Sequence, residues 1–171
     1  MALIVGAGLT AAFTVRAQRQ SEKTASGESY TYAETAESYE NRCTLSIDCS
    51  SVLAHEDRLS DAQLAYIPVN GLIFEASEIG FHAGETAFDV ALRACESAGV
   101  AVEYNTTPLT GSSYIEGINQ LYEFDCGELS GWKYSVNGEW PGIAATDYTL
   151  SDGDLVLWYF TCDGVTEYLT E

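Results

Sequence analysis

Cations are scarce in this sequence, and most of them lie near its start. Residues 43–171 contain only Arg58, Arg93 and Lys133 as lysine or arginine, against twenty-one Asp and Glu. A surface this acidic repels phosphate backbones and anionic lipid headgroups. We therefore expect no nucleic-acid partner, and contact with a membrane only through the N-terminal segment.

The sequence also lacks the short motifs that mark many catalytic and metal sites. Its only histidines are His55 and His82, no two cysteines form a CxxC pair, and HExxH, GxSxG, P-loop and GxGxxG motifs do not occur. Asp152 and Asp154 flank Gly153, but the remaining ligands of an EF-hand are missing, so a tight turn explains them better. We predict no catalytic residues and no metal site, and hence that the protein is not an enzyme.

No hydrophobic run is long enough to span a bilayer comfortably. Met1–Val15 is uncharged and apolar, which suits the hydrophobic region of a signal peptide, although no basic residue precedes it. We expect residues 1–17 to be a signal peptide or the remnant of a membrane anchor. The protein would then be extracellular or displayed at the cell surface.

Residues 18–42 have too few apolar residues to form a core. They are rich in Ser, Thr, Glu and Ala, a composition typical of a spacer. The folded domain is therefore expected to span residues 43–171.

The strongest local signal for strands lies in the last third of the chain. Asn137-Gly138 tolerates the positive φ values of a type I′ turn, so residues 132–136 and 139–143 are predicted to form a hairpin. A two-residue loop sets the pairing, and successive side chains alternate between the two faces. The face expected to pack on the core carries Trp132, Tyr134, Val136, Pro141 and Ile143. The opposite face carries Lys133, Ser135, Trp140 and Gly142.

Trp140 therefore projects away from its aromatic neighbours, beside the cation Lys133. An exposed tryptophan on a hairpin often marks a contact surface, although a neighbouring loop could equally cover it. We predict a ligand-binding surface on the hairpin and the loops around two nearby tyrosines. Its candidate residues are Trp140, Lys133, Ser135, Trp132, Tyr134, Tyr122 and Tyr148.

Two further elements frame this hairpin. Leu155–Cys162 is apolar on both faces, which indicates a central strand buried on both sides. Thr86–Ala98 has apolar residues at helical spacing between a Thr86 cap and a stop at Gly99, and is the main predicted helix. Other strands are expected at Cys43–Leu53, Leu72–Phe74, Glu78–Phe81, Val100–Tyr104 and Tyr114–Phe124, the last broken at Gly117.

The five cysteines favour disulfides in an exported protein. Cys43 and Cys49 share one face of a strand and cannot bridge each other. If the first and last strands are parallel neighbours, Cys49 and Cys162 lie at matching ends, and this is the first candidate pair. Cys95 with Cys126 is the second, which leaves one thiol free or bridged to another chain.

Four segments together resemble a bacterial exported family of unknown function: CTLSIDC, GETAFDV, YIEGINQLYEFDCGELSGWKYSVNG and DYTLSDGDLVLWYFTCD. That family is related to the C-terminal domain of the vitamin B12 carriers transcobalamin and intrinsic factor. With the carriers the chain shares a weaker pattern: a strand with a tryptophan, a Gly-Ile pair, an Asp-Tyr pair, an acidic turn at Asp-Gly and a final apolar strand. These features fall on Trp132, Gly142-Ile143, Asp147-Tyr148, Asp152-Gly153-Asp154 and Leu155–Tyr159.

The resemblance implies an α+β, β-grasp-like fold for residues 43–171. A mixed sheet would pack on one helix, at about 86–98, with the first strand beside the last and a β-hairpin near the C-terminus. In the carriers this domain covers the exposed face of the corrinoid, while a separate helical domain forms most of the pocket.

Two functions from different classes follow. The first is an exported, non-catalytic module that binds cobalamin, another corrinoid or a different soluble ligand; no cofactor is otherwise expected. The second is a structural or protein-interaction domain of a cell-surface protein, in which the sheet edge or the spare cysteine engages a partner. A catalytic site assembled by the fold alone is a third, minor alternative.

Overall fold

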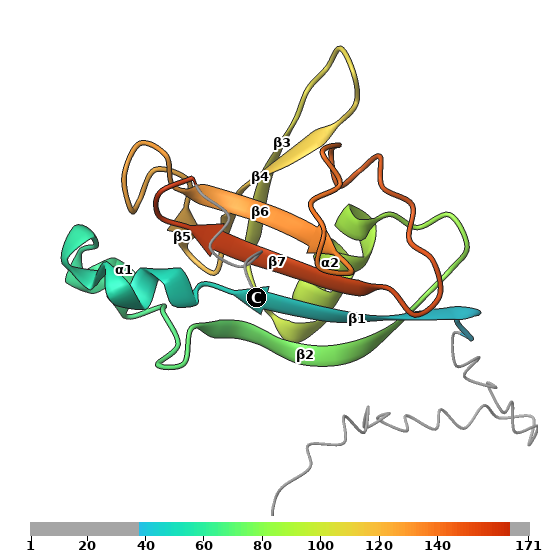
Figure 1. Cartoon of the computed structure of the whole chain (residues 1–171), viewed down its shortest axis with the longest axis horizontal. Helices are drawn as coiled ribbons and strands as arrows, with labels where there is room; N and C mark the ends of the chain where they lie inside the picture. The colour runs from blue at the N-terminus through green and yellow to red at the C-terminus, as the bar shows by residue number, and fades with distance from the viewer. Residues whose placement is uncertain (1–37, 165–171) are drawn as a thin grey trace, which may run out of the picture. The chain divides into compact units, whose positions relative to one another are not determined.

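In the computed structural model, residues 38–164 are described, and they form a mixed α+β domain (Figure 1). The predicted signal or anchor segment, most of the predicted spacer and the last seven residues lie outside the described part. The helices and strands are β1 Asn41–Asp48, η1 Ser50–Ala54, η2 Glu56–Arg58, α1 Asp61–Leu64, β2 Leu72–Phe81, α2 Ala87–Ala98, β3 Val102–Thr106, β4 Ser113–Ile118, β5 Leu121–Tyr122, β6 Gly131–Val136 and β7 Leu155–Thr161.

The main sheet has four strands in the order β2-β1-β7-β6. β1 and β7 are parallel, with Thr44 opposite Leu155 and Asp48 opposite Tyr159, while the outer pairs are antiparallel. The first strand therefore lies beside the last, and β7 is a central strand, as predicted. Its two-sided apolar pattern follows from this position, because a central strand covered on both faces needs apolar residues on both.

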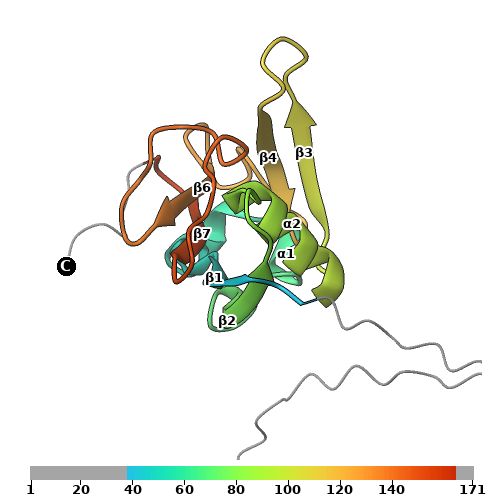
Figure 2. The ribbon, with the colours of Figure 1, turned by 90° about the vertical axis from the view of Figure 1, so that its right-hand side faces the viewer.

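Helix α2 covers one face of this sheet (Figure 2). Thr86 Oγ1 accepts a hydrogen bond from Asp89 N at 3.2 Å, and an oxygen of the Asp89 carboxylate accepts one from Thr86 N at 3.0 Å. Gly99 ends the helix with a φ of 70°, which an L-residue adopts at a cost. Phe88, Ala91 and Cys95 are buried against the sheet, which confirms the predicted helix.

The second sheet has the order β3-β4-β5, and its β3–β4 hairpin extends away from the main sheet (Figures 1 and 2). The predicted break at Gly117 is wrong, because β4 continues through that residue to a turn at Asn119-Gln120. Gly117 instead leaves room for the Tyr122 ring, which packs where a side chain at position 117 would lie.

The second arm of the predicted hairpin does not form. Asn137 and Gly138 have φ values of 54° and 79°, as a type I′ turn requires, but residues after the Val136–Glu139 bridge leave the sheet. Pro141 has no N–H to continue the ladder. Ile143, predicted in the core, is half exposed. The antiparallel partner of β6 is β7, and the other edge of β6 is left without a strand.

Other strand boundaries differ in detail. β1 ends at Asp48 because its carboxylate accepts a hydrogen bond from Ser50 N at 2.6 Å, where the 3-10 helix η1 begins. The two strands predicted at 72–74 and 78–81 are one strand, β2, whose pairing with β1 shifts register twice. No described helix is long and apolar enough to cross a bilayer.

Both predicted disulfides are wrong: the observed bond joins Cys126 to Cys162, whose Cα atoms lie 5.2 Å apart. The parallel register puts Cys49 level with Phe160, two residues short of Cys162. Ser51 of η1 occupies the intervening position and donates a hydrogen bond to Phe160 O at 2.6 Å.

Three thiols are free and buried, Cys43, Cys49 and Cys95. Burial raises their pKa values, to about 11 for Cys43 and about 12 for Cys49 and Cys95. They are therefore protonated and shielded from solvent near neutral pH, which makes them poor nucleophiles.

Candidate functional site

An open groove runs along the free edge of β6, between this strand and β4. It encloses about 560 Å³, and four consecutive β6 residues, Gly131–Tyr134, line it. Tyr114 and Ile115 of β4 form one wall, and Trp140 and Ile143 of the loop after β6 lie on another side. Since β6 is the last strand of its sheet, the groove follows from the missing hairpin arm.

The loop between β6 and β7 closes one end of the groove. Ser112 Oγ donates to the Asp147 carboxylate at 3.3 Å, and Ser113 N donates to Thr146 Oγ1 at 3.4 Å. Tyr134 from β6 donates its hydroxyl to Ile143 O at 2.9 Å. These bonds hold the loop against both β4 and β6.

The segment after β5 forms the opposite end, where Phe124 and Leu129 line the groove. Phe124 N donates to Ser130 O at 3.1 Å, and Cys126 N donates to Ser130 Oγ at 3.0 Å. The Cys126–Cys162 disulfide ties this segment to the end of β7. Phe124 also has a φ of 69°, an uncommon conformation for an aromatic residue and one often found at functional sites.

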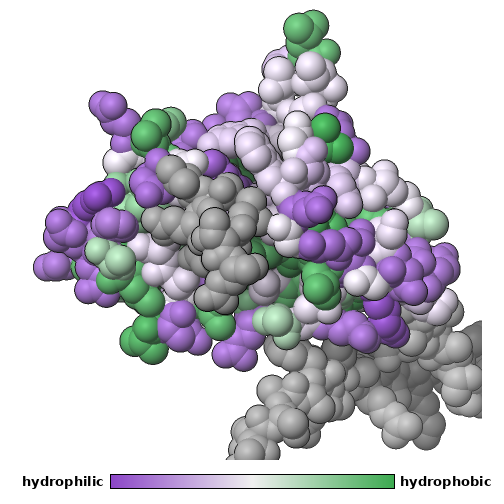
Figure 3. Space-filling view, in the orientation of Figure 1, coloured by the Kyte–Doolittle hydropathy of each residue, from purple (hydrophilic) through white to green (hydrophobic). Residues whose placement is uncertain are grey.

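Exposed apolar side chains gather at this groove. Ten large hydrophobic residues are exposed in residues 38–164, and five of them line it. They are Tyr114, Phe124, Leu129, Trp140 and Ile143. Contiguous exposed apolar surface is typical of a binding site. In Figure 3 the surface below the tip of the β3–β4 hairpin is largely pale, the colour of intermediate hydropathy, while strongly hydrophilic residues gather at the left and right.

All three tryptophans of the chain, Trp132, Trp140 and Trp158, line the groove. Trp132 Nε1 donates to Leu121 O at 2.9 Å. The Trp158 indole stacks on Tyr134 with ring centroids 5.3 Å apart, but its buried Nε1 finds no acceptor among the described residues. A buried donor without a partner costs about 1–3 kcal/mol.

The structure brings together four of the seven predicted site residues. Trp132, Tyr134, Lys133 and Trp140 all line the groove, and Trp140 is 57 % exposed. Lys133 Nζ lies 5.6 Å from the centre of the Trp140 ring, and its ammonium donates to Gly164 O at 2.6 Å. The cation thus holds the exposed indole in place through a cation–π contact.

The other three predicted residues lie outside the lining. Ser135 is buried. The Tyr122 hydroxyl donates to the Glu103 carboxylate at 2.6 Å, a hydrogen bond that raises the tyrosine pKa. Tyr148 packs edge-on against Tyr134 at 6.3 Å between ring centroids. It therefore supports a groove residue and does not face the groove.

Sequence reasoning missed Tyr114, Phe124 and Leu129. Tyr114 belongs to a predicted strand whose position relative to β6 no local pattern reveals. Phe124 ends the same predicted strand. Leu129 is an isolated apolar residue in a polar, glycine-containing stretch, and that contrast is a signal that could have identified it.

The groove is acidic and its phenols are neutral. Desolvation raises the pKa of Tyr114 to about 12, with a contribution from its hydrogen bond to Glu123, and desolvation also raises that of Tyr134 to about 12. Both are hydrogen-bond donors near neutral pH. Glu123 and Glu128 line the groove, and Lys133 is the one cation among its described lining residues.

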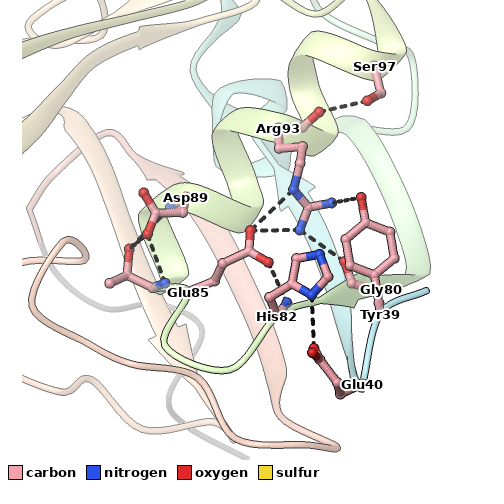
Figure 4. A network of polar contacts seen from close by, with 9 residues as sticks. Tyr39, Glu40, Gly80, His82, Glu85, Asp89, Arg93 and Ser97 are labelled. Atoms are coloured by element: carbon pink, nitrogen blue, oxygen red, sulfur yellow. Dashed lines mark hydrogen bonds and ion pairs between the residues drawn. The ribbon is translucent and has the colours of Figure 1, made fainter. Parts of the chain in front are cut away.

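A second polar cluster lies between α2, β2 and the start of the described chain (Figure 4). Arg93 donates to the Glu85 carboxylate at 2.9 Å and to Gly80 O at 2.9 Å, and its guanidinium carbon lies 4.9 Å from the centre of the Tyr39 ring. His82 Nδ1 lies 2.9 Å from Glu40, a hydrogen bond that lowers the Glu40 pKa. We call this cluster the clasp, since it joins the start of the described chain to β2 and α2.

Residues 84–162, which include α2 to β7, match the model of a domain of unknown function, DUF4430. No curated protein matches the chain. In the described part, no group of three His, Cys, Asp or Glu is arranged to hold a metal ion.

Seventeen chains of solved structures match, including the following two. Haptocorrin in complex with Cbi is 14 % identical with a TM-score of 0.50, and the match covers 73 % of this chain. The chain spans only 25 % of the length of haptocorrin. A "putative metal binding protein" from Ruminococcus gnavus ATCC 29149 is 15 % identical over 71 % of this chain and 97 % of its own, with a TM-score of 0.42. Haptocorrin supports the fold alone, and the second match carries no argument.

Proposed function

We propose that this chain is an exported, non-catalytic module that binds a soluble ligand in the groove along β6. One observation carries the proposal. Half of the large hydrophobic residues that are exposed within residues 38–164, and all three tryptophans, line a single open cavity of about 560 Å³. Pockets of this size, mainly apolar with a few polar groups, are typical of ligand sites.

Export is supported by the disulfide between Cys126 and Cys162, because such bonds persist in oxidising compartments. A non-catalytic role is supported by two of the polar groups of the groove; a third, the Tyr114 hydroxyl, donates to the Glu123 carboxylate at 2.7 Å. The Tyr134 hydroxyl and the Lys133 ammonium both donate to main-chain carbonyl oxygens, so neither is positioned beside a general base.

A corrinoid is the first ligand to test. The fold is similar to part of haptocorrin, which binds Cbi, and the exposed faces of Trp140 and Phe124 suit a large flat ligand. Haptocorrin is four times as long as the matched region, so a corrinoid held by this chain would be covered on one side only.

The alternative, a protein-interaction domain, is favoured by the free edge of β6. An interaction in which a spare cysteine of this chain engages the partner is disfavoured, because the three free thiols are buried and protonated.

Tryptophan fluorescence tests the proposal directly, since every tryptophan borders the groove. We expect saturable quenching on titration with cobalamin, corrected with free N-acetyltryptophanamide for absorption by the ligand. Trp140→Ala should weaken binding at least tenfold. Tyr66→Ala, at a residue that is also half exposed but does not line the groove, is the matched control. No saturation at millimolar cobalamin would remove the corrinoid, and equal affinities of the two variants would place the site elsewhere.

A further inference from the structure

The main chain of β6 has one edge paired with β7 and a second edge that carries no strand, where Trp132 and Tyr134 are 4 % and 5 % exposed. Asn137 N donates to Leu155 O of β7 at 2.8 Å, whereas Val136 N points the other way and donates to Glu139 O at 2.9 Å. In an antiparallel ladder this direction alternates from residue to residue. Lys133 and Ser135 therefore bond to β7, while the N–H and C=O of Trp132 and Tyr134 point outward.

These outward groups face the groove. Trp132 and Tyr134 both line it, and their main-chain N–H and C=O groups make no hydrogen bond to the described residues. The residues that could have paired with them, 139–143, leave the sheet after one bridge. An edge strand bordered by exposed apolar side chains is a template for an added strand, and proteins usually shield such an edge.

We infer that the groove takes an extended peptide segment of a basic partner protein, which adds to β6 as a further strand. Main-chain hydrogen bonds to Trp132 and Tyr134 would hold the segment, and its alternate side chains would contact the two walls. The inference rests on the proposed function in one respect, that the groove is a binding site.

Charge indicates which peptides fit. Glu123 and Glu128 border the groove, and the ammonium of Lys133 already donates to Gly164 O. Residues 43–171 carry twenty-one acidic residues against three lysines and arginines. A segment that alternates basic and apolar residues would satisfy both the carboxylates and the apolar walls, and it would be attracted at long range.

The probe is an octapeptide of alternating lysine and valine with blocked ends, and the readout is amide hydrogen exchange by NMR on the whole protein. At saturation, exchange of the Trp132 and Tyr134 amides should slow at least tenfold, because these amides gain partners. The Lys133 and Ser135 amides, already bonded to β7, should change less than twofold. This alternation is specific for strand addition.

Three matched probes control the experiment. The same octapeptide with glutamate in place of lysine should bind at least tenfold more weakly. Two further peptides carry N-methyl groups, one on the lysine amides and the other on the valine amides. Only one of these two sets of N–H groups can face β6, so one methylated peptide should lose binding and the other should keep it. On the protein, Glu128→Gln should weaken binding two- to fivefold, and Glu96→Gln, on the exposed face of α2, should not.

The outcomes separate this inference from the proposed function. Saturable quenching by cobalamin without protection of the two amides leaves the groove a ligand site and overturns strand addition. Binding that is indifferent to both methylated probes also overturns it. Protection that appears without peptide and grows with protein concentration would assign the edge to a second copy of the chain, which contradicts a basic partner.

Discussion

The clasp and the groove share no residue, and they differ in whether their polar groups have hydrogen-bond partners. In the clasp, Arg93 meets a carboxylate, a carbonyl oxygen and an aromatic ring, and Glu85 also accepts from His82 N at 2.5 Å (Figure 4). In the groove, Trp158 Nε1 and the outward main-chain groups of Trp132 and Tyr134 have no partner among the described residues, and large apolar side chains face solvent.

This difference separates a structural cluster from a binding surface. Satisfied polar groups hold elements together, because any change leaves a buried charge or donor unpaired. Unsatisfied donors beside exposed aromatics lower stability, and they are retained where a ligand supplies the missing partner. Variants of the two regions should therefore separate loss of stability from loss of binding.

The disulfide should contribute most. Replacing Cys126 and Cys162 together by serine opens a loop closed across 36 positions, which should lower the free energy of unfolding by about 3–4 kcal/mol. The same change frees the Phe124–Ser130 end of the groove, so ligand binding should be lost as well. Chemical denaturation measures the first effect and fluorescence titration the second. Unchanged binding in a folded double variant would show that this end of the groove is held by other contacts.

Arg93→Met should destabilise the protein by about 1–3 kcal/mol, because it leaves the carboxylate of the partly buried Glu85 without its partner. Arg93→Lys should recover only part of this loss, since a lysine cannot reach Glu85, Gly80 and Tyr39 together. Groove affinity should stay within twofold in both variants, as seen by quenching. A large loss of affinity in a stable variant would couple the clasp to the groove and contradict the division.

Alkaline pH should weaken the core that both regions share. Burial raises the pKa of the Cys49 thiol from 9.0 to about 12, and that of Cys95 likewise, so the folded state keeps protons that the unfolded state releases. This contribution is fully present below pH 9 and is lost as pH rises towards 12. Each thiol should contribute about 1–2 kcal/mol of the loss by pH 10.5. Cys49→Ala should flatten the dependence of Tm on pH, and an unchanged slope would contradict the assignment.

Trp140→Ala should leave stability within about 0.5 kcal/mol of the parent, because the indole is mostly exposed. Its large effect on binding and small effect on stability are the reverse of those of Arg93→Met. Measuring both variants by denaturation and by titration therefore tests directly whether the clasp serves stability and the groove serves binding. A loss of stability equal to that of Arg93→Met would make Trp140 a structural residue.

The exposed pair of Glu40 and His82 should have the smallest effect. Its hydrogen bond lowers the Glu40 pKa, so any stabilisation is present above pH 4.5 and is lost as pH falls through the lower folded value. Glu40→Gln should leave Tm near neutral pH almost unchanged. A large shift would show that the clasp depends on this contact.

Local patterns predicted the elements well and the site in part. Thr86 and Gly99 bound the helix as their cap and stop roles require, and Asn137-Gly138 makes the expected turn. Trp140 is exposed as predicted, although the strand arm whose alternation predicted this does not form. Ser135, on that same predicted face, is buried, since alternation says which face a residue takes but not what covers that face.

The sequence by itself determined the capped helix, the two-sided apolar strand β7 and the turn after β6. Each depends on φ preferences and hydrophobic periodicity within a dozen residues. Only the tertiary structure decided that Cys126 joins Cys162, that residues 139–143 leave β6 unpaired and that Tyr114, Phe124 and Leu129 meet the tryptophans. These features depend on strand register and on contacts between segments far apart in the chain, where one residue of offset changes every neighbour.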